Sequence, residues 1–167
     1  DLFRLKEAEY HTSKAIEINP NISSFHSNLG IILRDQDRLQ DAEYHTHKAI
    51  KLDPNSADAH SNLGIILRNL GRLQEAEYHT RKAIEINPNI SNAHLILGII
   101  LRDLGRLQEA EYHTHEAIKL DPNSAVAHSN LGIILRELGK LRELIDLSKS
   151  TIESKSINKE YKLIASI

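Results

Sequence analysis

The sequence contains no cysteine, no methionine and no tryptophan. Without cysteine, disulfides, thiolate nucleophiles and cysteine-ligated zinc are excluded. No apolar run approaches the roughly 18 residues that a membrane span needs, and the N-terminus has no signal-peptide pattern. The 21 basic and 23 acidic residues give a net charge of -2, which creates no global field for nucleic acid or an acidic membrane. We therefore expect a cytoplasmic protein that binds neither nucleic acid nor membrane. Because the chain starts at Asp1 and lacks methionine, we also expect an excised or engineered segment of something longer.

Patterns that would support catalysis are also missing. The chain has no glycine-rich phosphate loop, no nucleophile constellation and no paired-carboxylate pattern, so we expect neither enzymatic activity nor a cofactor. The histidines of "EYHTHKAI" invite a metal site, but His45 and His47 would point about 200° apart on a helix. Glu43 and His47, like Glu111 and His115, could share an ion but have no third ligand nearby. We predict no physiological metal site.

Repetition dominates what is present. "HSNLGIILR" starts at His26, His60 and His128, "HLILGIILR" starts at His94, and each start lies 34 residues from the next. A fixed period of this length is typical of stacked helix-turn-helix units. A longer rhythm of 68 residues is superimposed: "KLDPNSA" starts at Lys51 and Lys119, and "EINPNI" at Glu17 and Glu85. The longer rhythm indicates duplication of a pair of units.

Each unit carries two amphipathic stripes. The first stripe, in residues 57–70, consists of Ala59, Leu63, Ile66, Leu67 and Leu70. The second, after Gly71, consists of Leu73, Ala76, Thr80, Ala83 and Ile84. Gly64 and Ala76 leave no bulk where the two helices cross, so the backbones can approach closely. One helix pair cannot bury its apolar face alone, and the pattern therefore predicts an all-α solenoid.

These residues resemble the tetratricopeptide repeat, whose leucine-glycine, alanine and proline spacing is matched by Leu63, Gly64, Leu67, Gly71, Leu73, Ala76, Ala83 and Pro88. The resemblance implies a single right-handed α-solenoid over residues 1–167. It begins with a half repeat (1–22, second helix only), continues through full repeats 23–56, 57–90 and 91–124, and ends in a degenerate repeat (125–156) and a cap helix (157–167).

Several positions depart from the family pattern. Histidines occupy the first aromatic position (His26, His60, His94 and His128), where we expect them to be packed and hydrogen-bonded. Threonines occupy the second (Thr12, Thr46, Thr80 and Thr114). Asp37 replaces a turn glycine, and Leu144 and Thr151 replace alanines in the last repeat.

In the family, the side of each first helix opposite the core stripe lines a concave groove. On this side we place Asp58 and Ser61 together with three columns of residues. The columns are Asn28, Asn62 and Asn130, interrupted by Ile96; Ile31, Ile65, Ile99 and Ile133; and Arg34, Arg68, Arg102 and Arg136. The isoleucines either contact a ligand or are partly buried by superhelical curvature. The arginines predict a preference for acidic peptides, moderated by Asp35, Asp103 and Glu137.

"AHSNLG" further resembles the superhelical repeat domain of O-GlcNAc transferase, where an asparagine ladder holds peptide backbone. An amide both donates and accepts, which suits that role, and we expect these asparagines to lie outside the core. The alternative is that each asparagine bonds to a neighbouring helix. Tyr10, Tyr44, Tyr78 and Tyr112 should lie on the convex side, either over basic side chains or as a second contact surface.

We therefore interpret the chain as a non-enzymatic protein-interaction scaffold that binds an extended protein or peptide segment in its groove. One alternative is an accessory, substrate-recruiting region of a larger enzyme such as a glycosyltransferase. Another is a self-associating or engineered array, because the half repeat in residues 1–22 leaves an apolar face open to end-to-end contact.

Overall fold

The computed structural model describes residues 2–146, 148 and 149 of the 167-residue chain. Its helices are α1 (Leu2–Ile18), α2 (Ser23–Asp35), α3 (Leu39–Leu52), α4 (Ala57–Asn69), α5 (Leu73–Ile86), α6 (Ser91–Asp103), α7 (Leu107–Leu120) and α8 (Ala125–Glu137). Helical backbone resumes at residues 141–146 and at 148 and 149. No helix in these ranges is long and apolar enough to cross a membrane.

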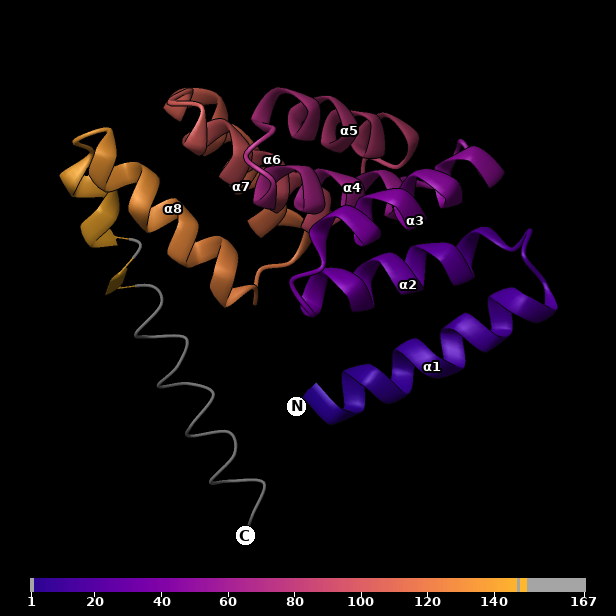
Figure 1. Cartoon of the computed structure of the whole chain (residues 1–167). Coiled ribbons are helices and arrows are strands. Elements are labelled where there is room, and N and C mark those ends of the chain that lie inside the picture. Colours follow the sequence, from indigo (N-terminus) through magenta and orange to yellow (C-terminus); the bar gives the residue numbers. More distant parts are fainter. Residues whose placement is uncertain (1, 147, 150–167) are drawn as a thin grey trace, which may run out of the picture.

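Successive helices pack in pairs and the pairs stack into an arc (Figure 1). The closest pairs are α2 with α3, α4 with α5, and α6 with α7, and each pair then packs on the next. The backbones of the first helices α2, α4, α6 and α8 also approach one another, whereas those of α3, α5 and α7 stay farther apart. The first helices therefore lie on the inner side of the curve. The predicted helical solenoid is confirmed.

Burial follows the predicted stripes. Ala59, Leu63, Ile66 and Leu67 of α4 are fully or almost fully buried, and Leu70 is half-buried. On α5, the small residues Ala76, Thr80 and Ala83 have no exposed surface. One cluster joins Leu63 and Leu67 to Ala76 on α5 and to Ile96 and Ile100 on α6. The core therefore runs continuously from repeat to repeat, as a solenoid requires.

The close helix crossing explains why threonine replaces an aromatic residue on the second helix. A Cβ added to Gly64 would collide with Thr80 Oγ1 and would lie 3.3 Å from the Ala76 carbonyl oxygen. The Thr80 hydroxyl donates to that same carbonyl at 2.8 Å. Gly30 and Thr46, and Gly98 and Thr114, repeat the arrangement. A larger side chain at the threonine position would separate the two helices.

The 68-residue rhythm reappears in how the first helices begin. Ser56 and Ser124 cap α4 and α8 by accepting from the backbone N–H of Ala59 and Ala127. In the other pair of repeats, Ser23 and Ser91 lie inside the helix and donate to the carbonyls of Ala49 and Ala117 at 2.9 Å. The two members of each pair are thus built differently, in agreement with duplication of a pair.

The turn between first and second helices needs a left-handed residue. Gly71, Gly105 and Gly139 adopt φ angles of 76°, 75° and 71° there, and Asp37 adopts 63°. Aspartate tolerates this region better than most residues because its short polar side chain bonds locally. Asp37 therefore forms the same turn as the glycines of the other repeats.

The N-terminal half repeat has one uncovered side. Ala8 and Ala15 of α1 are only half-buried, whereas their counterparts Ala42 and Ala49 on α3 are fully buried. End-to-end association through this face stays a prediction. At the other end of the chain, Thr151 and the predicted cap helix at 157–167 lie outside the described residues.

Candidate functional site: the inner face of the solenoid

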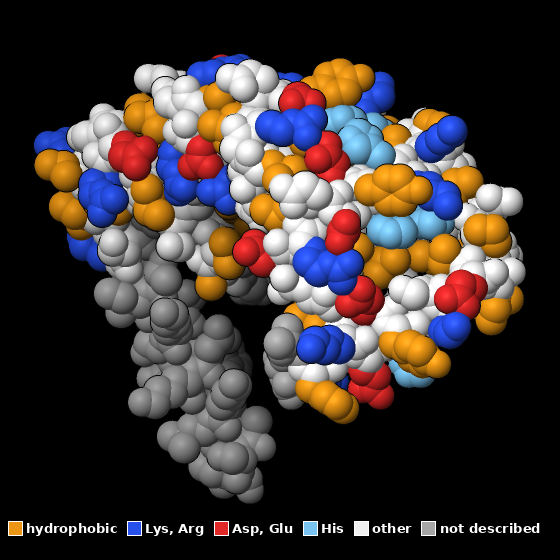
Figure 2. Space-filling view, in the orientation of Figure 1, with side chains coloured by type: hydrophobic (Ala, Val, Ile, Leu, Met, Phe, Trp, Pro, Cys, Tyr) orange, Lys and Arg blue, Asp and Glu red, His pale blue; other side chains and the backbone are white. Residues whose placement is uncertain are grey.

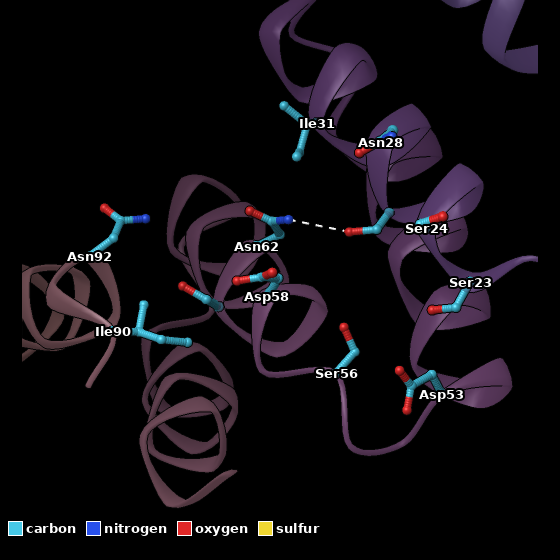
Figure 3. Close-up of a pocket in the computed structure, with 12 residues that line it drawn as sticks. Ser23, Ser24, Asn28, Ile31, Asp53, Ser56, Asp58, Asn62, Ile90 and Asn92 are labelled. Carbon is cyan, nitrogen blue, oxygen red and sulfur yellow. Dashed lines mark hydrogen bonds between the residues drawn. The ribbon is translucent and has the colours of Figure 1, made fainter. Parts of the chain in front are cut away.

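Two hollows on the inner face are lined by residues that the structure describes. The first has a volume of about 410 Å³ and lies between α2, α4 and the start of α6, where Ser24 and Asn28 face Asp58 and Asn62 (Figure 3). The second, of about 390 Å³, lies between α4, α6 and α8, and is lined by Arg68, Ile99, Arg102, Val126, Asn130 and Ile133. Most residues of the predicted columns therefore do line concave surface.

The asparagine column is not uniform. Asn28 is exposed, and Asn62 is half-buried and donates through Nδ2 to Ser27 Oγ at 3.3 Å. Asn130 is only 4% exposed; it donates to Thr114 Oγ1 at 3.0 Å and accepts from Arg102 Nη1 at 2.7 Å. The expectation that these asparagines lie outside the core is therefore wrong for Asn130, whose hydrogen bonds join three helices.

Two substitutions in the 91–124 repeat explain the difference. The bond from Asn62 to Ser27 links one repeat to the repeat before it. In the next repeat Ile96 replaces the asparagine, so Ser61 has lost the donor that Ser27 keeps. Leu95 replaces the serine, so Asn130 finds no hydroxyl on the first helix of the preceding repeat, α6, and bonds instead to Thr114 on its second helix, α7. Leu95 and Ile96 are instead buried, 8% and 6% exposed.

Ser61 is left with an unsatisfied hydroxyl. The residue is 4% exposed, lines the first hollow, and its Oγ has no hydrogen-bond partner among the described residues. Leaving a buried hydroxyl unpaired costs about 1–3 kcal/mol. Sequence reasoning placed Ser61 on the groove side but did not foresee its burial, because the partner at position 96 belongs to another repeat.

The isoleucine column is half-buried throughout. Ile65 packs against the cluster that contains Leu63, Leu67 and Ile96, and Ile99 packs against Leu95. Ile31 lines the first hollow. Curvature of the stack, one of the two explanations given above, accounts for part of this burial. The surface that stays exposed on Ile31, Ile99 and Ile133 is apolar lining of the hollows.

The arginine column is largely neutralised. Arg34 forms an ion pair with Asp35 at 2.7 Å, while Arg68 and Arg102 both reach Asp103, at 2.6 and 3.3 Å. Arg136 is exposed and has no ion-pair partner in the described part of the chain. Asp35 and Asp103 thus offset the arginines as expected, although Asp103 does so for two repeats at once.

The two hollows consequently differ in charge. The described residues that line the first include Asp53 and Asp58 but no lysine, arginine or histidine. Those that line the second include Arg68 and Arg102 but no acidic residue. The first hollow is therefore lined by carboxylates without cations, whereas the arginines of the second are paired with Asp103.

Histidine pairs on the outer side of the first helices were not anticipated. His26, His60 and His94 each meet a histidine of the second helix, with Nδ1–Nδ1 distances of 3.1 Å to His45, 3.0 Å to His79 and 3.2 Å to His113. The predicted packing and hydrogen bonding of the first-helix histidines is confirmed. The signal that could have identified the partners is their constant separation of 19 residues.

A backbone carbonyl sets the tautomers of each pair. Nε2 of His60 lies 3.3 Å from the Pro54 carbonyl oxygen, which can only accept, so Nε2 carries the proton. Nδ1 of a neutral His60 then accepts, and His79 must donate through its own Nδ1. The pair can gain one further proton on His79 Nε2. A second proton would force two Nδ1–H groups together.

Burial adds to this resistance to protonation. Desolvation, followed by the neighbouring first-helix histidine, lowers the pKa of His79 and of His113 to about 4. The same two causes lower the pKa of His45. Desolvation is also the main cause that lowers the pKa of His60. His45, His60, His79 and His113 are therefore neutral at pH 7.

The convex surface carries the tyrosines. Tyr10, Tyr44, Tyr78 and Tyr112 are each at least 60% exposed, and each forms an edge contact with the histidine that follows it. Histidine and apolar side chains of successive repeats are visible at the surface in Figure 2. Across the described ranges, no group of three or more histidine, aspartate or glutamate side chains is placed to hold a metal ion.

Paired antiparallel helices, a continuous core and a lined inner groove define the class of helical-repeat solenoids. Models of the tetratricopeptide repeat match residues 23–56, 57–90, 91–124 and 116–145. The chain belongs to the tetratricopeptide repeat family. The matches at 23–56, 57–90 and 91–124 follow one another at the 34-residue period of the sequence.

Solved structures share the fold at low sequence identity. MamA is 23% identical with a TM-score of 0.82, covering 94% of this chain and 92% of its own. YrrB, described as a tetratricopeptide repeat protein with an unusual peptide-binding site, is 22% identical with a TM-score of 0.71, covering 91% and 78%. The first such domain of Spaghetti (RPAP3), bound to the HSP90 peptide SRMEEVD, is 21% identical with a TM-score of 0.68, covering 70% and 93%. No curated protein matches the sequence.

Proposed function

We propose that this chain is a non-enzymatic protein-interaction scaffold that binds an extended peptide segment along its inner face. The observation that carries the proposal is the first hollow, whose polar side chains retain unused hydrogen-bonding capacity. The side chains of Asn28 and Asp58 are exposed and make no hydrogen bond within the described residues, and the side chain of Asn62 uses only one of its N–H groups. An extended peptide backbone presents alternating donors and acceptors that amide side chains can satisfy.

Two further features support a peptide over a small molecule. The hollows are open and lie in succession along stacked helices, as a strand-like ligand requires, whereas small-molecule sites are enclosed. Ile31 in the first hollow and Ile99 and Ile133 in the second supply apolar contacts for side chains. YrrB and the Spaghetti domain, which share the fold, are described with a peptide-binding site and a bound peptide.

Selection from a random peptide library, followed by mapping of the bound peptide through backbone amide NMR shifts, tests the proposal. We expect the shifts to concentrate on residues of α2, α4 and α6 that line the hollows. Replacing Asn28 and Asn62 together by alanine should weaken binding about tenfold, because each loses hydrogen bonds worth about 0.5–1.5 kcal/mol.

The matched control is Tyr44→Ala with Tyr78→Ala, a double change on the convex surface that should leave affinity unchanged. Peptides that instead shift resonances around the tyrosines, and lose affinity in the tyrosine variant, would contradict groove binding and favour the convex surface. The same experiment on a longer natural chain would show whether the groove recruits substrates for an attached enzyme.

A further inference from the structure

We infer that the first hollow is a subsite for a cationic side chain, lysine or arginine, of the bound segment. The inference rests on the proposed function and names the chemistry that one end of the groove recognises. Asp53 and Asp58 line the hollow, and among the described lining residues no cation offsets them. One oxygen of Asp53 accepts from the backbone N–H of Asn55 at 3.1 Å, while Asp58 is exposed and unpaired in the described structure.

A second observation points to a ligand at the same place. Ser61 lies about one helical turn from Asp58 and lines the hollow, and its hydroxyl is buried without a hydrogen-bond partner in the described part of the chain. The corresponding hydroxyl one repeat earlier, Ser27, accepts from Asn62. An ammonium or guanidinium group supplies several donors to carboxylate and hydroxyl oxygens and accepts nothing, so it complements this set of groups.

The start of α4 does not require Asp58. Residues 119–132 repeat residues 51–64 at every position except 58, where the second copy has Val126. Both copies start their helix identically: Ser56 accepts from the N–H of Ala59, and Ser124 accepts from the N–H of Ala127. Since α8 forms the same cap without an aspartate, Asp58 is available for a ligand.

The shape of the hollow suits a long basic side chain. Ile31 and Ile90 stand on opposite sides of it in Figure 3, with Asp58 between them. Lysine and arginine bury their methylene stems on apolar surface while the charged end stays with polar groups. The second hollow offers no carboxylate among its described lining residues, and its Arg68 and Arg102 both pair with Asp103.

Three synthetic peptides test the inference by NMR titration. Each is acetylated and amidated and carries lysine, glutamine or glutamate between two flanking Gly-Ser-Ile-Ser-Gly sequences. We expect the lysine peptide to bind about three- to tenfold more tightly than the glutamine peptide at low salt, and the glutamate peptide to bind most weakly. The lysine preference should shrink as salt is added.

Two variants that each remove one negative charge distinguish a local effect of Asp58 from an effect of the protein's net charge. Asp58→Asn should abolish the lysine preference. Asp121→Asn, which lies in the second copy away from the first hollow, should preserve it.

Peptides that bind the groove without a lysine preference overturn the inference and leave the proposed function standing. A preference lost equally in both variants also overturns it, because the effect would then be long-range charge. If no peptide shifts any groove residue, both the inference and the proposed function fail.

Discussion

Residues 51–64 and 119–132 form the same helix start from sequences that differ only at Asp58 and Val126, yet their inner faces bond differently. In the first copy Asn62 is half-buried and donates to Ser27. In the second copy Asn130 is buried and bonds to Thr114 and Arg102. Ser61 is buried, whereas Ser129 is exposed. Sequence identity of the copies therefore does not give them the same role.

The cause lies in the preceding repeat. The first copy packs on α2, which presents Ser27, and the second packs on α6, which presents Leu95. Each repeat in a solenoid packs against the repeat before it and the repeat after it. A substitution in one repeat therefore changes the hydrogen bonds available to the next. The comparison can be tested by making the neighbours alike, by removing the bonds that differ, and by exchanging the one residue that distinguishes the copies.

The largest effect is expected from Leu95→Ser combined with Ile96→Asn, which gives α6 the "HSNLG" phrase of the other repeats. Both side chains are buried, so their loss should reduce the free energy of unfolding by about 3–5 kcal/mol, even with hydrogen bonds regained. Urea unfolding measures the loss, with Val126→Ala, an exposed apolar residue, as control. A crystal structure of the double variant should show the new amide at position 96 bonded to Ser61. Unchanged bonding of Asn130 would contradict the role assigned to the preceding repeat.

Removing the asparagines one at a time should separate the copies. Asn130→Ala should lower the free energy of unfolding by about 2 kcal/mol, because it removes a buried side chain together with its two hydrogen bonds, to Arg102 and to Thr114. Asn62→Ala should cost about 1 kcal/mol, because it leaves the buried Ser27 hydroxyl without the donor of a bond that is long, at 3.3 Å. Thermal and urea unfolding of the two variants measure both values. Equal losses would mean that burial does not distinguish the two side chains.

Lowering the pH should also affect the stability of the two copies differently, because His60 has a histidine partner while His128 has none in the described chain. The folded pKa of His79 is about 4, below the ordinary value of 6.5, so the folded state binds fewer protons between these values. Stability is therefore fully present above pH 6.5 and is lost as the pH falls towards 4. We expect about 1 kcal/mol per pair, since solvent screens these half-exposed rings.

Hydrogen exchange at pH 7 and pH 5 measures this effect by region. After correction for intrinsic exchange rates, α4 and α5 should lose more protection on acidification than α8. The variant His79→Leu, which removes the titrating partner of His60, should remove most of the pH dependence of α4. Equal loss of protection in α4 and α8 would show that the histidine pairs are not its source.

The smallest effect is expected from exchanging the distinguishing residue. Asp58→Val and Val126→Asp should each change the free energy of unfolding by less than about 0.5 kcal/mol, because both positions are exposed and the serine caps stay intact. Thermal unfolding of the two single variants and the double exchange measures this. A loss above about 1 kcal/mol for Asp58→Val would assign Asp58 to the fold and weaken its proposed role towards a ligand.

Much of the architecture was predictable because each repeat restates it. The stripe of Ala59, Leu63 and Leu67 indicated which helix face is buried, and the pairing of Gly64 with Ala76 indicated the close crossing. The groove was predicted less well. Laying residues on a helical wheel placed Asn130 and Ser61 opposite the core, but a wheel describes one helix, and these side chains are covered by other repeats. The pairing of arginines from two repeats with Asp103 was missed for the same reason.

The sequence by itself determined the helices and their order, since the 34-residue period and the apolar spacing are local properties that every copy repeats. Only the tertiary structure decided which asparagine is free, which serine lacks a partner and which histidines meet across a repeat. Those outcomes depend on contacts between side chains 16 to 35 residues apart. Stacking sets these contacts, and one substitution in a neighbouring repeat can redirect them while leaving the helices unchanged.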